Sequence, residues 1–335
     1  MLCSRLAGSS YGHRSAPAGH VVFSEAPPSD SDRPGRERDD GRVTEVTSLS
    51  RTGLDGRPEL DDATAAALDR LEAWFRGEQA VVVAFSGGAD SAFVAWVATQ
   101  VMGADRVLCT TAVSPSLPAS ELDDCRALAA EWHLRWEPVV TDEMDDPAYQ
   151  RNDADRCYHC KEALGRALGP VASAGGAVVV LGVNLDDLGE HRPGQRSAAE
   201  RGARFPLVEA GFTKAMVRDA SRHLGLRTAD KPAAACLASR VPYGTPVTLG
   251  VLREVEEAEA GLKALGFGEL RVRHYRDMAR IEVPVDRMAD LVAQRDAVVA
   301  AVRAAGYRYV TVDLEGLRSG NLNAALADLG TAVSS

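Results

Sequence analysis

Residues 80–102 read AVVVAFSGGADSAFVAWVATQVM, and this stretch decides the fold. A short apolar run ends at Phe85, two glycines follow at Gly87 and Gly88, and an apolar helix-forming run begins at Ser91. A strand that turns through glycines into a helix presents backbone N–H groups at the helix N-terminus, where they bind anions. The stretch therefore predicts a buried strand, a phosphate-binding loop and a covering helix.

Apolar strands and helices alternate on both sides of this stretch. The expected elements are a helix over 60–76, strands at 80–85, 107–113, 135–140 and 177–183, and a helix over 120–133. Strands that are apolar throughout, instead of at every second residue, are typical of a parallel sheet covered on both faces. Residues 56–246 are therefore expected to form an α/β domain with a doubly wound parallel sheet.

The two ends of the chain have different patterns. After the α/β domain we expect a helix over 248–265, strands near 269–275 and 279–284, a helix over 286–305 and a strand over 307–314. This order predicts a small α+β domain over 247–335. Residues 1–55 are rich in Ser, Pro, Gly, Arg and Asp without an apolar period, which predicts a disordered N-terminal extension.

Composition narrows the class of protein. The chain has 335 residues, is 45% hydrophobic, and carries 38 Lys+Arg against 48 Asp+Glu, a net charge of -10. This balance disfavours a broad electrostatic grip on nucleic acid, so no nucleic-acid partner is expected and a small anionic or nucleotide substrate fits better. The sequence has no apolar run of about 18 residues and no apolar signal core, so we expect a cytoplasmic protein without membrane association.

The phosphate loop carries polar groups as well as glycines. Ser86 and Ser91 add hydroxyl donors, and Asp90 either orients the loop or holds magnesium. No Walker GxxxxGK[ST] sequence occurs, which disfavours transfer of a γ-phosphate. The string SGGxDS resembles the PP-loop of the ATP-pyrophosphatases, which split ATP into AMP and pyrophosphate while adenylylating a carboxylate, amide or nucleobase oxygen. The resemblance implies ATP and Mg²⁺ as cofactors, with Ser86, Gly87, Gly88, Asp90 and Ser91 binding ATP.

Three of the six cysteines stand in contexts that suggest chemistry. Cys157 and Cys160 form a CxxC within RCYHCK, and Cys236 lies in ACLASR. In a large chain without a secretory signal, such cysteines favour thiol, metal or cluster chemistry over disulfides. Three thiolates with His159 suit zinc, and three cysteines also hold an iron–sulfur cluster with one iron open. Spacing alone leaves these alternatives open, together with a redox-active CxxC.

Longer strings extend the resemblance along the chain. Besides SGGADS and RCYHCK, the sequence contains LGVNLDDLGEHRPG at 181–194, FPLVEAGFTKAMVRDASRHLGL at 205–226, DKPAAACLASRVPYGTPVT at 230–248, RVRHY at 271–275, ARIEV at 279–283 and DLEGLRSGNLN at 313–323. In this order, from about residue 60 to 323, the chain resembles the LarE family of ATP-dependent sulfur transferases, which build the organic part of the nickel-pincer cofactor. Ala89, Glu190, His191 and Ala229 depart from the residues more usual in that family, and none of them removes a ligand.

The resemblance implies a reaction and a source of sulfur. A carboxylate of pyridinium-3,5-biscarboxylic acid mononucleotide would be adenylylated and converted to a thiocarboxylate. In one kind of family member, the cysteine matching Cys236 gives up its own sulfur and becomes dehydroalanine. In the other kind, cysteines matching Cys157, Cys160 and Cys236 hold a 4Fe-4S cluster with a transferable sulfide. This chain has all three cysteines, so both routes to sulfur stay open. The donor that would replenish the sulfide is unknown. The resemblance also implies a homo-oligomer, such as a hexamer, with the sulfur site near subunit interfaces.

Further polar residues extend the predicted site. Asp186 and Asp187 follow the strand at 177–183 and therefore lie at the carboxyl edge of the sheet, where open α/β sheets bind ligands. Together with Asp90 they are candidate magnesium ligands. The alternative is that they are solvated acids of a loop. Arg271 and Arg273 alternate along a strand and share one face, which suits a phosphate. Arg192 is a further candidate phosphate contact, although a surface arginine fits the same position. The resemblance adds Arg318 as a phosphate contact and Glu259, Glu282 and Asp290 as a second metal site; from spacing alone these acids are ordinary solvated residues. Ser239 and Arg240 stand beside Cys236 and are candidate substrate contacts.

Other functions fit part of this pattern. A tRNA 2-thiolation enzyme also joins SGGxDS to CxxC, but it predicts a basic tRNA-binding face. An amidotransferase-type synthetase of the NAD or GMP synthetase kind uses a PP-loop but does not need the three cysteines. A protein that senses ATP without turnover leaves the cysteines unexplained and would release no pyrophosphate with any substrate.

Overall fold

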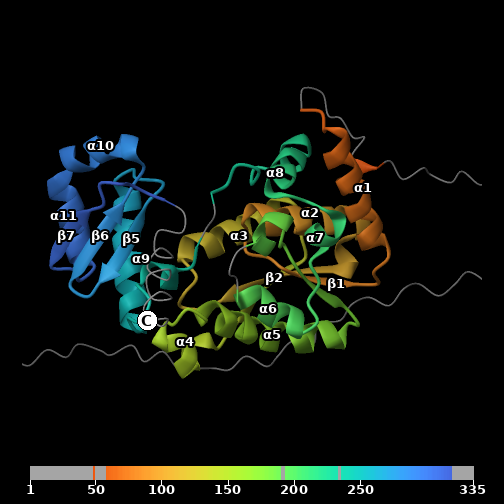
Figure 1. Ribbon diagram of the computed structural model, residues 1–335, viewed down its shortest axis with the longest axis horizontal. Helices are drawn as coiled ribbons and strands as arrows, with labels where there is room; N and C mark the ends of the chain where they lie inside the picture. The colour runs from red at the N-terminus through yellow and green to blue at the C-terminus, as the bar shows by residue number, and fades with distance from the viewer. Residues whose placement is uncertain (1–47, 50–57, 190–192, 233–234, 319–335) are drawn as a thin grey trace, which may run out of the picture.

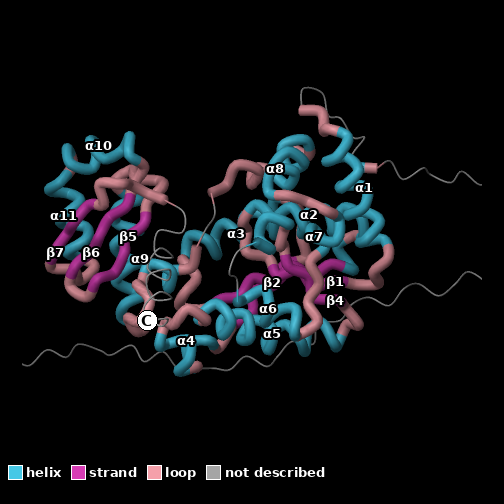
Figure 2. Tube along the Cα trace, in the orientation of Figure 1, coloured by secondary structure: helices cyan, strands magenta, loops and turns pink. Residues whose placement is uncertain are grey.

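The computed structural model describes residues 48–49, 58–189, 193–232 and 235–318. Its helices and strands form a larger body on a parallel sheet and a smaller body on a mixed sheet (Figure 1, Figure 2). The predicted class, α/β with a small α+β unit after it, is therefore confirmed. None of the helices in the described ranges combines the length and hydropathy of a membrane span.

The larger body contains a four-stranded parallel sheet in the order β3-β2-β1-β4. Its strands are β1 (Val81–Ala84), β2 (Val107–Val113), β3 (Trp136–Val140) and β4 (Val178–Leu181). Val81 aligns with Val107 on one side and with Val178 on the other. The chain winds outward from β1 to β3 and then returns to β4 on the opposite side of β1. The loops after β1 and β4 therefore meet at a topological switch point, where open α/β sheets bind ligands.

Helices cover both faces of this sheet. Val81 and Val83 pack into a core with the helices of one face, and Val82 packs against α5 on the other, as the alternation of strand side chains requires. The first face carries five helices: α1 (Asp62–Arg76), α2 (Ala89–Met102), α3 (Ala119–Glu131), α7 (Pro206–Ala210) and α8 (Lys214–His223) (Figure 1). The second face carries α5 (Arg156–Ala174), and α4 (Pro147–Arg151) and α6 (Pro193–Glu200) lie beside α5. Full burial of each valine contributes about 1.5–3 kcal/mol, so β1 anchors the loop that follows it.

The smaller body has a sheet and an apolar core of its own. Its strands β5 (Arg271–Tyr275), β6 (Met278–Glu282) and β7 (Tyr309–Val312) lie in the order β5-β6-β7, antiparallel and then parallel. The helices α9 (Leu249–Ala264), α10 (Met288–Ala293) and α11 (Arg295–Ala304) complete it. Leu262, Val272, Ile281 and Val302 are buried in its core. The Thr248 side chain accepts a hydrogen bond from the Val251 amide and caps α9, just after the predicted boundary between residues 246 and 247.

Several elements differ from the expectation. The predicted helix over 286–305 is wrong: it is two helices, α10 and α11, because the backbone leaves helical geometry at Gln294 (φ -95°, ψ 19°). Helices α4 to α8 were not predicted. In α5, glycines and Pro170 stand among the apolar residues and interrupt the helical spacing of its apolar side chains. The strand at 107–113 has the predicted bounds, and the other strands shift by one or two residues at their ends.

The predicted N-terminal extension lies almost wholly outside the described residues. Ser48 and Leu49 are described, and both hydrogen-bond to α1. The Ser48 hydroxyl donates to Asp69 at 2.5 Å, and the Leu49 amide donates to Glu72 at 2.8 Å. These two residues are therefore attached to the larger body.

Candidate active site

The phosphate loop joins β1 to α2 at the carboxyl end of the sheet. Gly87 has left-handed backbone geometry (φ 68°), and Gly88 is the N-cap of the 14-residue helix α2. Ser91 Oγ accepts a hydrogen bond from the Ser86 amide at 3.1 Å and donates to the Gly88 carbonyl at 3.2 Å. The Ser86 and Ser91 hydroxyls are 3.0 Å apart. The two serines thus close the loop over the first turn of α2, whose N-terminal amides suit an anion.

Two glycines allow close approaches at this loop. A Cβ on Gly87 would lie 2.8 Å from Cys125 Sγ. A Cβ on Gly182, the residue after β4, would lie 2.7 Å from the Ser91 nitrogen and 2.8 Å from the Asp90 carbonyl carbon. The neighbours of Gly182 are backbone atoms, which cannot move aside as a flexible side chain does. Gly182 therefore lets the loop after β4 lie directly against the phosphate loop.

Asp90 is the centre of a polar network at this edge of the sheet. Asn184 Nδ2 donates to Asp90 Oδ1 at 3.3 Å, and the Lys214 ammonium pairs with Asp90 Oδ2. The Lys214 amide donates to Asp186 Oδ2 at 2.7 Å, and the Asn184 amide donates to Asp187 Oδ2 at 3.1 Å. The structure thus brings the three candidate magnesium ligands to one edge, where each carboxylate accepts a hydrogen bond from the protein.

Lys231 holds the other side of the phosphate loop. Its ammonium donates to the Gly87 carbonyl at 3.1 Å, to Glu121 at 2.9 Å and to Asp124 at 2.5 Å. Burial lowers the pKa of Lys231, but the hydrogen bonds to Asp124 and Glu121 outweigh burial and raise that pKa above its usual value. Cys236 follows five residues later, so its Cα lies within about 18 Å of the Lys231 Cα. The residue that holds the phosphate loop and the sulfur-site cysteine are therefore at most one short segment apart.

The three predicted sulfur-site cysteines come from two segments. Cys157 and Cys160 lie in the first turns of α5, and Cys236 is the N-cap of the short 3₁₀ helix Leu237–Arg240. Cys157 is exposed, whereas Cys160 and Cys236 are partly buried against one apolar cluster. Burial raises the pKa of the Cys160 thiol to about 12, and the electrostatic effects of Cys236 and Cys157 add to the rise. Cys160 is therefore a protonated thiol at neutral pH.

A buried Asn152–Arg156 pair ties α5 to the Cys236 loop. Arg156 hydrogen-bonds to Asn152 Oδ1 and donates to the Ala238 carbonyl at 2.9 Å. Asn152 is fully buried and has left-handed backbone geometry (φ 61°). Its side-chain Nδ2 donates to three backbone carbonyls within residues 241–245 at 2.8–3.2 Å. A buried polar group without a partner costs roughly 1–3 kcal/mol, so these bonds fix the loop against α5.

Arg240 links the Cys236 loop to the smaller body. Its Nη1 donates to the carbonyls of Ala235 at 2.5 Å and Cys236 at 3.0 Å. Its Nε and Nη2 donate to the two oxygens of Glu259 at 2.8 and 3.1 Å, and Glu259 also accepts from the Val272 amide at 3.0 Å. Both side chains are buried, with 8% and 4% of their surface exposed. Arg240 and Glu259, expected to contact substrate and metal, thus form a buried pair that holds the backbone at Cys236.

Arg273 makes a second connection between the same two regions. Its Nη1 donates to the Ser239 carbonyl at 2.8 Å, and its Nη2 donates to Glu282 Oε2 at 2.8 Å. Arg280 donates to the other Glu282 oxygen at 3.0 Å. The Glu282 side chain is fully buried and that of Arg273 is 3% exposed. This pair too positions the backbone next to Cys236, because Ser239 Oγ donates to the Cys236 carbonyl at 2.7 Å.

Arg271 stands two residues before Arg273 on β5 and shares its face. It is partly buried, and its Nη1 donates to the Arg318 carbonyl at 3.1 Å. Burial lowers the pKa of Arg271, and the nearby Arg273 lowers it further. The exposed Arg318 side chain pairs with Glu315. Of the predicted phosphate contacts, Arg271 and Arg273 lie together on β5, and the backbone of Arg318 contacts Arg271. Arg192 lies outside the described residues.

Within the described ranges, no three or more His, Cys, Asp or Glu side chains form a group that could hold a metal ion. Asp290 is exposed on α10 and pairs with Arg287 at 2.9 Å, whereas Glu259 and Glu282 pair with buried arginines. His159 lies between aspartates at 3.2 and 3.4 Å. Three thiols have the right chemistry for an iron–sulfur cluster, but their arrangement here does not assemble a site. The cluster and the second metal stay predictions from the sequence.

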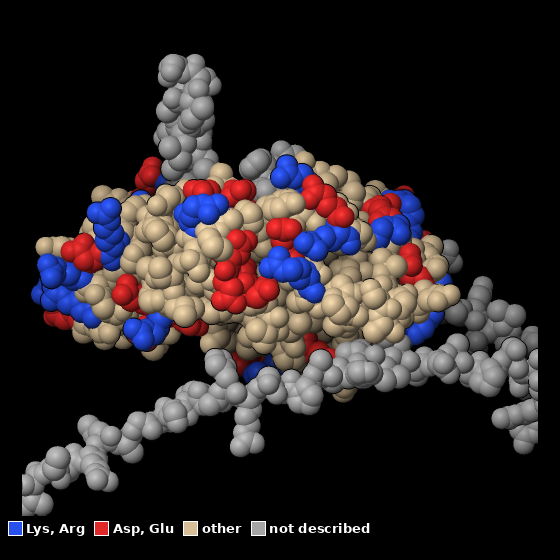
Figure 3. Space-filling model, turned by 90° about the horizontal axis from the view of Figure 1, so that it is seen from below, with Lys and Arg blue, Asp and Glu red and all other residues tan. Residues whose placement is uncertain are grey.

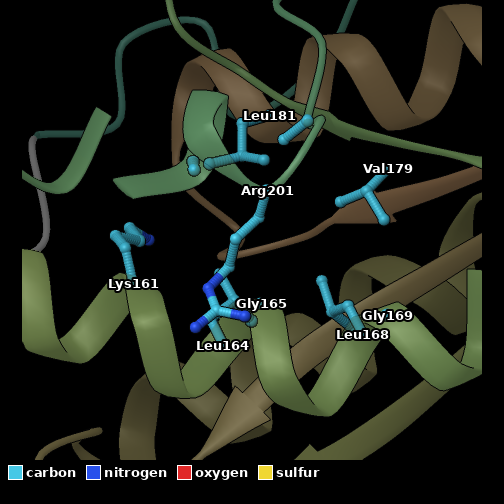
Figure 4. Close-up of a pocket in the computed structure, with 10 residues that line it drawn as sticks. Lys161, Leu164, Gly165, Leu168, Gly169, Val179, Leu181 and Arg201 are labelled. Atoms are coloured by element: carbon cyan, nitrogen blue, oxygen red, sulfur yellow. The ribbon is translucent and has the colours of Figure 1, made fainter. Parts of the chain in front are cut away.

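A small cavity of about 40 Å³ lies between α5 and β4, beside α6 (Figure 4). Its lining includes Leu164, Leu168, Val179, Leu181, Lys161 and Arg201. The Arg201 side chain reaches α5 (Figure 4). A Cβ on Gly165 would lie 2.4 Å from Arg201 Cδ, so the glycine leaves room for this arginine. Arg201 also pairs with Glu162 at 2.9 Å. These largely apolar walls do not suit a triphosphate.

Four residues of this site were missed from the sequence. They are Lys214 and Lys231 at the phosphate loop, and Asn152 and Arg156 at the cysteines. Their key contacts join residues 82 to 144 positions apart, so local spacing carried no signal of them. The signal available was that both lysines lie inside the long strings at 205–226 and 230–248.

A family model described as NAD synthase matches residues 70–155. The match includes β1, the phosphate loop and α2, and it ends just before Arg156 and the first predicted sulfur-site cysteine. It therefore supports the nucleotide part of the site and says nothing of the cysteine part.

Three relatives align with most of the chain. An uncharacterized protein of Synechocystis sp. is 44% identical, and the alignment covers 77% of this chain and 97% of the relative. The pyridinium-3,5-bisthiocarboxylic acid mononucleotide synthase of Lactiplantibacillus plantarum is 38% identical, and the alignment covers 76% of this chain and 93% of the relative. An uncharacterized protein of Methanocaldococcus jannaschii is 25% identical, and the alignment covers 71% of this chain and 91% of the relative. The resemblance carried by the phosphate loop and the long strings is thus confirmed over nearly the whole length of a relative. The chain belongs to the LarE family of PP-loop sulfur-transferring enzymes.

Proposed function

We propose that the protein adenylylates a carboxylate of pyridinium-3,5-biscarboxylic acid mononucleotide and converts it to a thiocarboxylate. The observation that carries this proposal is the connection between the phosphate loop and Cys236 through Lys231. The ammonium of Lys231 bonds to the loop, and the chain reaches Cys236 within about 18 Å of that residue. The name of the L. plantarum relative supports the same class of product.

The first step activates the carboxylate, which is a poor electrophile because oxide is a poor leaving group. A carboxylate oxygen attacks the α-phosphorus of ATP, the bond to the β-phosphate oxygen breaks, and pyrophosphate leaves. The N-terminal amides of α2 and the hydroxyls of Ser86 and Ser91 stabilise the charge that develops on pyrophosphate. Asp90, with Asp186 or Asp187, would hold Mg²⁺, which neutralises charge on the phosphates.

The second step transfers sulfur. The Cys236 sulfur attacks the acyl carbon, AMP leaves, and a thioester to Cys236 forms. Loss of the Cys236 Cα proton and cleavage of its Cβ–S bond then release the thiocarboxylate and leave dehydroalanine. A cluster on Cys157, Cys160 and Cys236 is the other source of sulfur that the sequence predicts, and no step is assigned to it here.

The substrate also needs a site for its own phosphate. Arg271 is partly buried, and the charges of Arg273 and Arg240 oppose its own, while Glu282 and Glu259 partly offset them. A bound phosphate relieves the repulsion between these guanidinium groups, and a guanidinium can bind it through two hydrogen bonds. We assign the substrate phosphate to Arg271, with the nearby Arg318 as a second contact.

Two other functions remain as outcomes of the test. The face in Figure 3 carries basic and acidic side chains interspersed, with acidic ones near its middle, so this face is not the broad basic surface that tRNA binding favours. The NAD synthase match supports ATP cleavage, but an ammonia-using synthetase has no use for Cys236 and its buried supports.

The proposal is tested with Mg·ATP and the pyridinium mononucleotide by measuring pyrophosphate, AMP and the mass change of sulfur replacing oxygen. Cys236→Ala should keep substrate-dependent pyrophosphate release and lose thiocarboxylate formation by at least about 1,000-fold, because the nucleophile is gone. Cys109→Ala, a buried cysteine of β2, is the matched control and should keep both. Amide formation with ammonia, or thiolation of tRNA in place of the mononucleotide, would contradict the proposal.

A further inference from the structure

A buried pair of hydroxyls lies close to Cys236. Ser116 stands in the loop between β2 and α3, and Tyr149 lies on α4. Their side-chain oxygens are 2.5 Å apart, and the two residues are 4% and 1% exposed. Neither hydroxyl takes part in the two steps of the proposed function.

Two contacts place this pair beside the Cys236 loop. The amide of Leu237, the residue after Cys236, donates to the Ser116 carbonyl at 2.8 Å. Tyr149 belongs to the apolar cluster against which Cys160 and Cys236 are packed. The Tyr149 side chain therefore extends from this cluster to Ser116, and its hydroxyl lies next to the segment that carries Cys236.

The two hydroxyls have one proton more than their hydrogen bond uses. Two O–H groups carry two protons, and only one of them can lie between the two oxygens. In the parts of the chain that the structure describes, neither oxygen has another hydrogen-bond partner. A buried donor without an acceptor is unfavourable, so the second proton is available to a neighbouring atom that gains negative charge.

Sulfur is the neighbouring acceptor. Burial raises the pKa of the Tyr149 hydroxyl well above its usual value, and the charges of Cys236 and Cys160 raise it further. The hydroxyl therefore keeps its proton at neutral pH and lies within electrostatic range of both sulfurs. Cys160 stays a neutral thiol, which is a weak acceptor, whereas the Cys236 sulfur reacts and gains charge.

We propose that Tyr149 donates a hydrogen bond to the Cys236 sulfur as the bond from that sulfur to Cβ breaks, and that Ser116 donates to the Tyr149 oxygen. Tyr149 is assigned the contact with sulfur because it shares the apolar cluster with Cys236. Ser116 strengthens the donor, since hydrogen bonds in a chain polarise one another.

The donor acts on the release of the thiocarboxylate, so the inference rests on the proposed function. In that step the Cα proton of Cys236 passes to water, and its electron pair forms the Cα–Cβ double bond. The electron pair of the Cβ–S bond stays on the sulfur of the thiocarboxylate. A donor held beside that sulfur stabilises the charge that develops there, and Tyr149 keeps its own proton throughout.

The test follows one turnover of metal-free, full-length protein with Mg·ATP and the pyridinium mononucleotide. Tyr149→Phe keeps the ring and removes the hydroxyl. We expect pyrophosphate release at the wild-type rate and thiocarboxylate release about 10- to 100-fold slower, because a hydrogen bond to a charged atom is lost. Tyr307→Phe removes another buried tyrosine hydroxyl, which bonds to His274 in the smaller body, and should keep both rates. Thermal unfolding checks that each variant is folded.

An accumulated intermediate distinguishes a donor to sulfur from a residue that only shapes the loop. If release is the slowed step, the thioester between Cys236 and the substrate should accumulate in Tyr149→Phe, and the peptide with Cys236 should carry the mass of the acyl group. A misplaced Cys236 would instead slow thioester formation, and no adduct would accumulate. That result, or a wild-type rate of thiocarboxylate release in Tyr149→Phe, would overturn the inference and leave the proposed function intact.

Ser116→Ala tests the arrangement of the pair. Because Ser116 acts through Tyr149, Ser116→Ala alone should slow thiocarboxylate release about 3- to 10-fold and should add no further loss to Tyr149→Phe. Independent losses that multiply in the double variant would overturn the proposed order from Ser116 through Tyr149 to sulfur. A wild-type protein that forms no thiocarboxylate in the same experiment would contradict the sulfur step of the proposed function itself, which is a separate outcome.

Discussion

The nucleotide half and the sulfur half of the site are held by contacts of different kinds. At the phosphate loop, short-range bonds between Ser86, Gly88 and Ser91 set the conformation, and the Lys214–Asp90 pair beside them is 35% and 20% exposed. Around Cys236, the ion pairs Arg240–Glu259 and Arg273–Glu282 join residues 19 and 9 positions apart on different elements, and their side chains are at most 8% exposed. A partly solvated pair can exchange partners, whereas a buried pair is fixed.

This difference suggests a division of work. The nucleotide half must bind and release a polyanion in each cycle, so cations that can change partner are useful there. The sulfur half must hold one sulfur atom near an acyl carbon, so a rigid backbone is useful there. The partly exposed Lys214–Asp90 pair at the loop and the buried pairs at Cys236 thus match each half to its task.

The largest expected effect concerns the cysteines of the sulfur half in the metal-free protein. Burial raises the pKa of Cys160 to about 12 from an ordinary value of 9.0, so near pH 8 its thiolate is about 1,000-fold scarcer than in the unfolded chain. Iodoacetamide should therefore modify the exposed Cys157 readily, while Cys160 reacts about 1,000-fold more slowly than in urea. Peptide mass spectrometry over time measures both rates.

The sign of the pH dependence follows from the same shift. The folded state holds the Cys160 proton more tightly than the unfolded chain, so this contribution to stability is full below about pH 9 and is lost as the pH rises toward 12. Labelling of folded Cys160 should rise over that same range. Equal labelling rates for Cys160 in the folded and unfolded protein would show that the thiol is not protected as described.

The second prediction breaks one buried pair. Glu282→Gln removes the charge that faces Arg273 and Arg280, and we expect the free energy of unfolding to fall by about 3–5 kcal/mol. Asp296→Asn removes an acid that is 93% exposed and should change it by less than about 0.5 kcal/mol. Urea unfolding measures the free energy of unfolding of both variants. If Glu282→Gln lost as little stability as Asp296→Asn, the buried pairs would not fix the sulfur half.

The third prediction concerns the contact between β4 and α2. Gly182→Ala places a Cβ 2.7 Å from the Ser91 nitrogen, so the first turn of α2 must shift; we expect a loss of about 1–3 kcal/mol in stability and weaker ATP binding. Gly169→Ala on α5 meets no atom within 4 Å and should stabilise the helix by up to about 1 kcal/mol. Calorimetric titration with ATP and thermal unfolding test both variants. Unchanged ATP affinity in Gly182→Ala would show that this close approach does not shape the phosphate loop.

The same contrast explains what the sequence could predict. The strand, the glycine turn and the helix at the phosphate loop were predicted because they follow one another within 23 residues and depend on local backbone chemistry. The alternation of strands and helices likewise predicted the parallel sheet. Spacing pointed to the three cysteines and to Arg271 and Arg273, and the resemblance to the LarE family added the acids, but neither gave their arrangement.

Most of the rest depended on contacts between different elements of structure. Glu259 and Glu282 were predicted as metal ligands, and the structure pairs them with Arg240 and Arg273, which spacing cannot reveal. Lys231 was missed because its three acceptors come from the loop and from α3, more than 100 residues earlier. The break at Gln294 inside a strongly helical pattern was missed for a local reason: no proline or glycine marks it.

The most direct test of the account follows the sulfur. Protein purified without oxygen is analysed for iron, acid-labile sulfide and zinc, and the mass of the peptide with Cys236 is then compared before and after one turnover. In metal-free protein, the account predicts that Cys236 loses the mass of hydrogen sulfide as one thiocarboxylate appears. About four irons that are lost with Cys157→Ala would instead assign the sulfur to a cluster on the same cysteines. Stoichiometric zinc on these cysteines, or thiocarboxylate formed by metal-free protein whose Cys236 is unchanged, would contradict the claim that sulfur passes through Cys236.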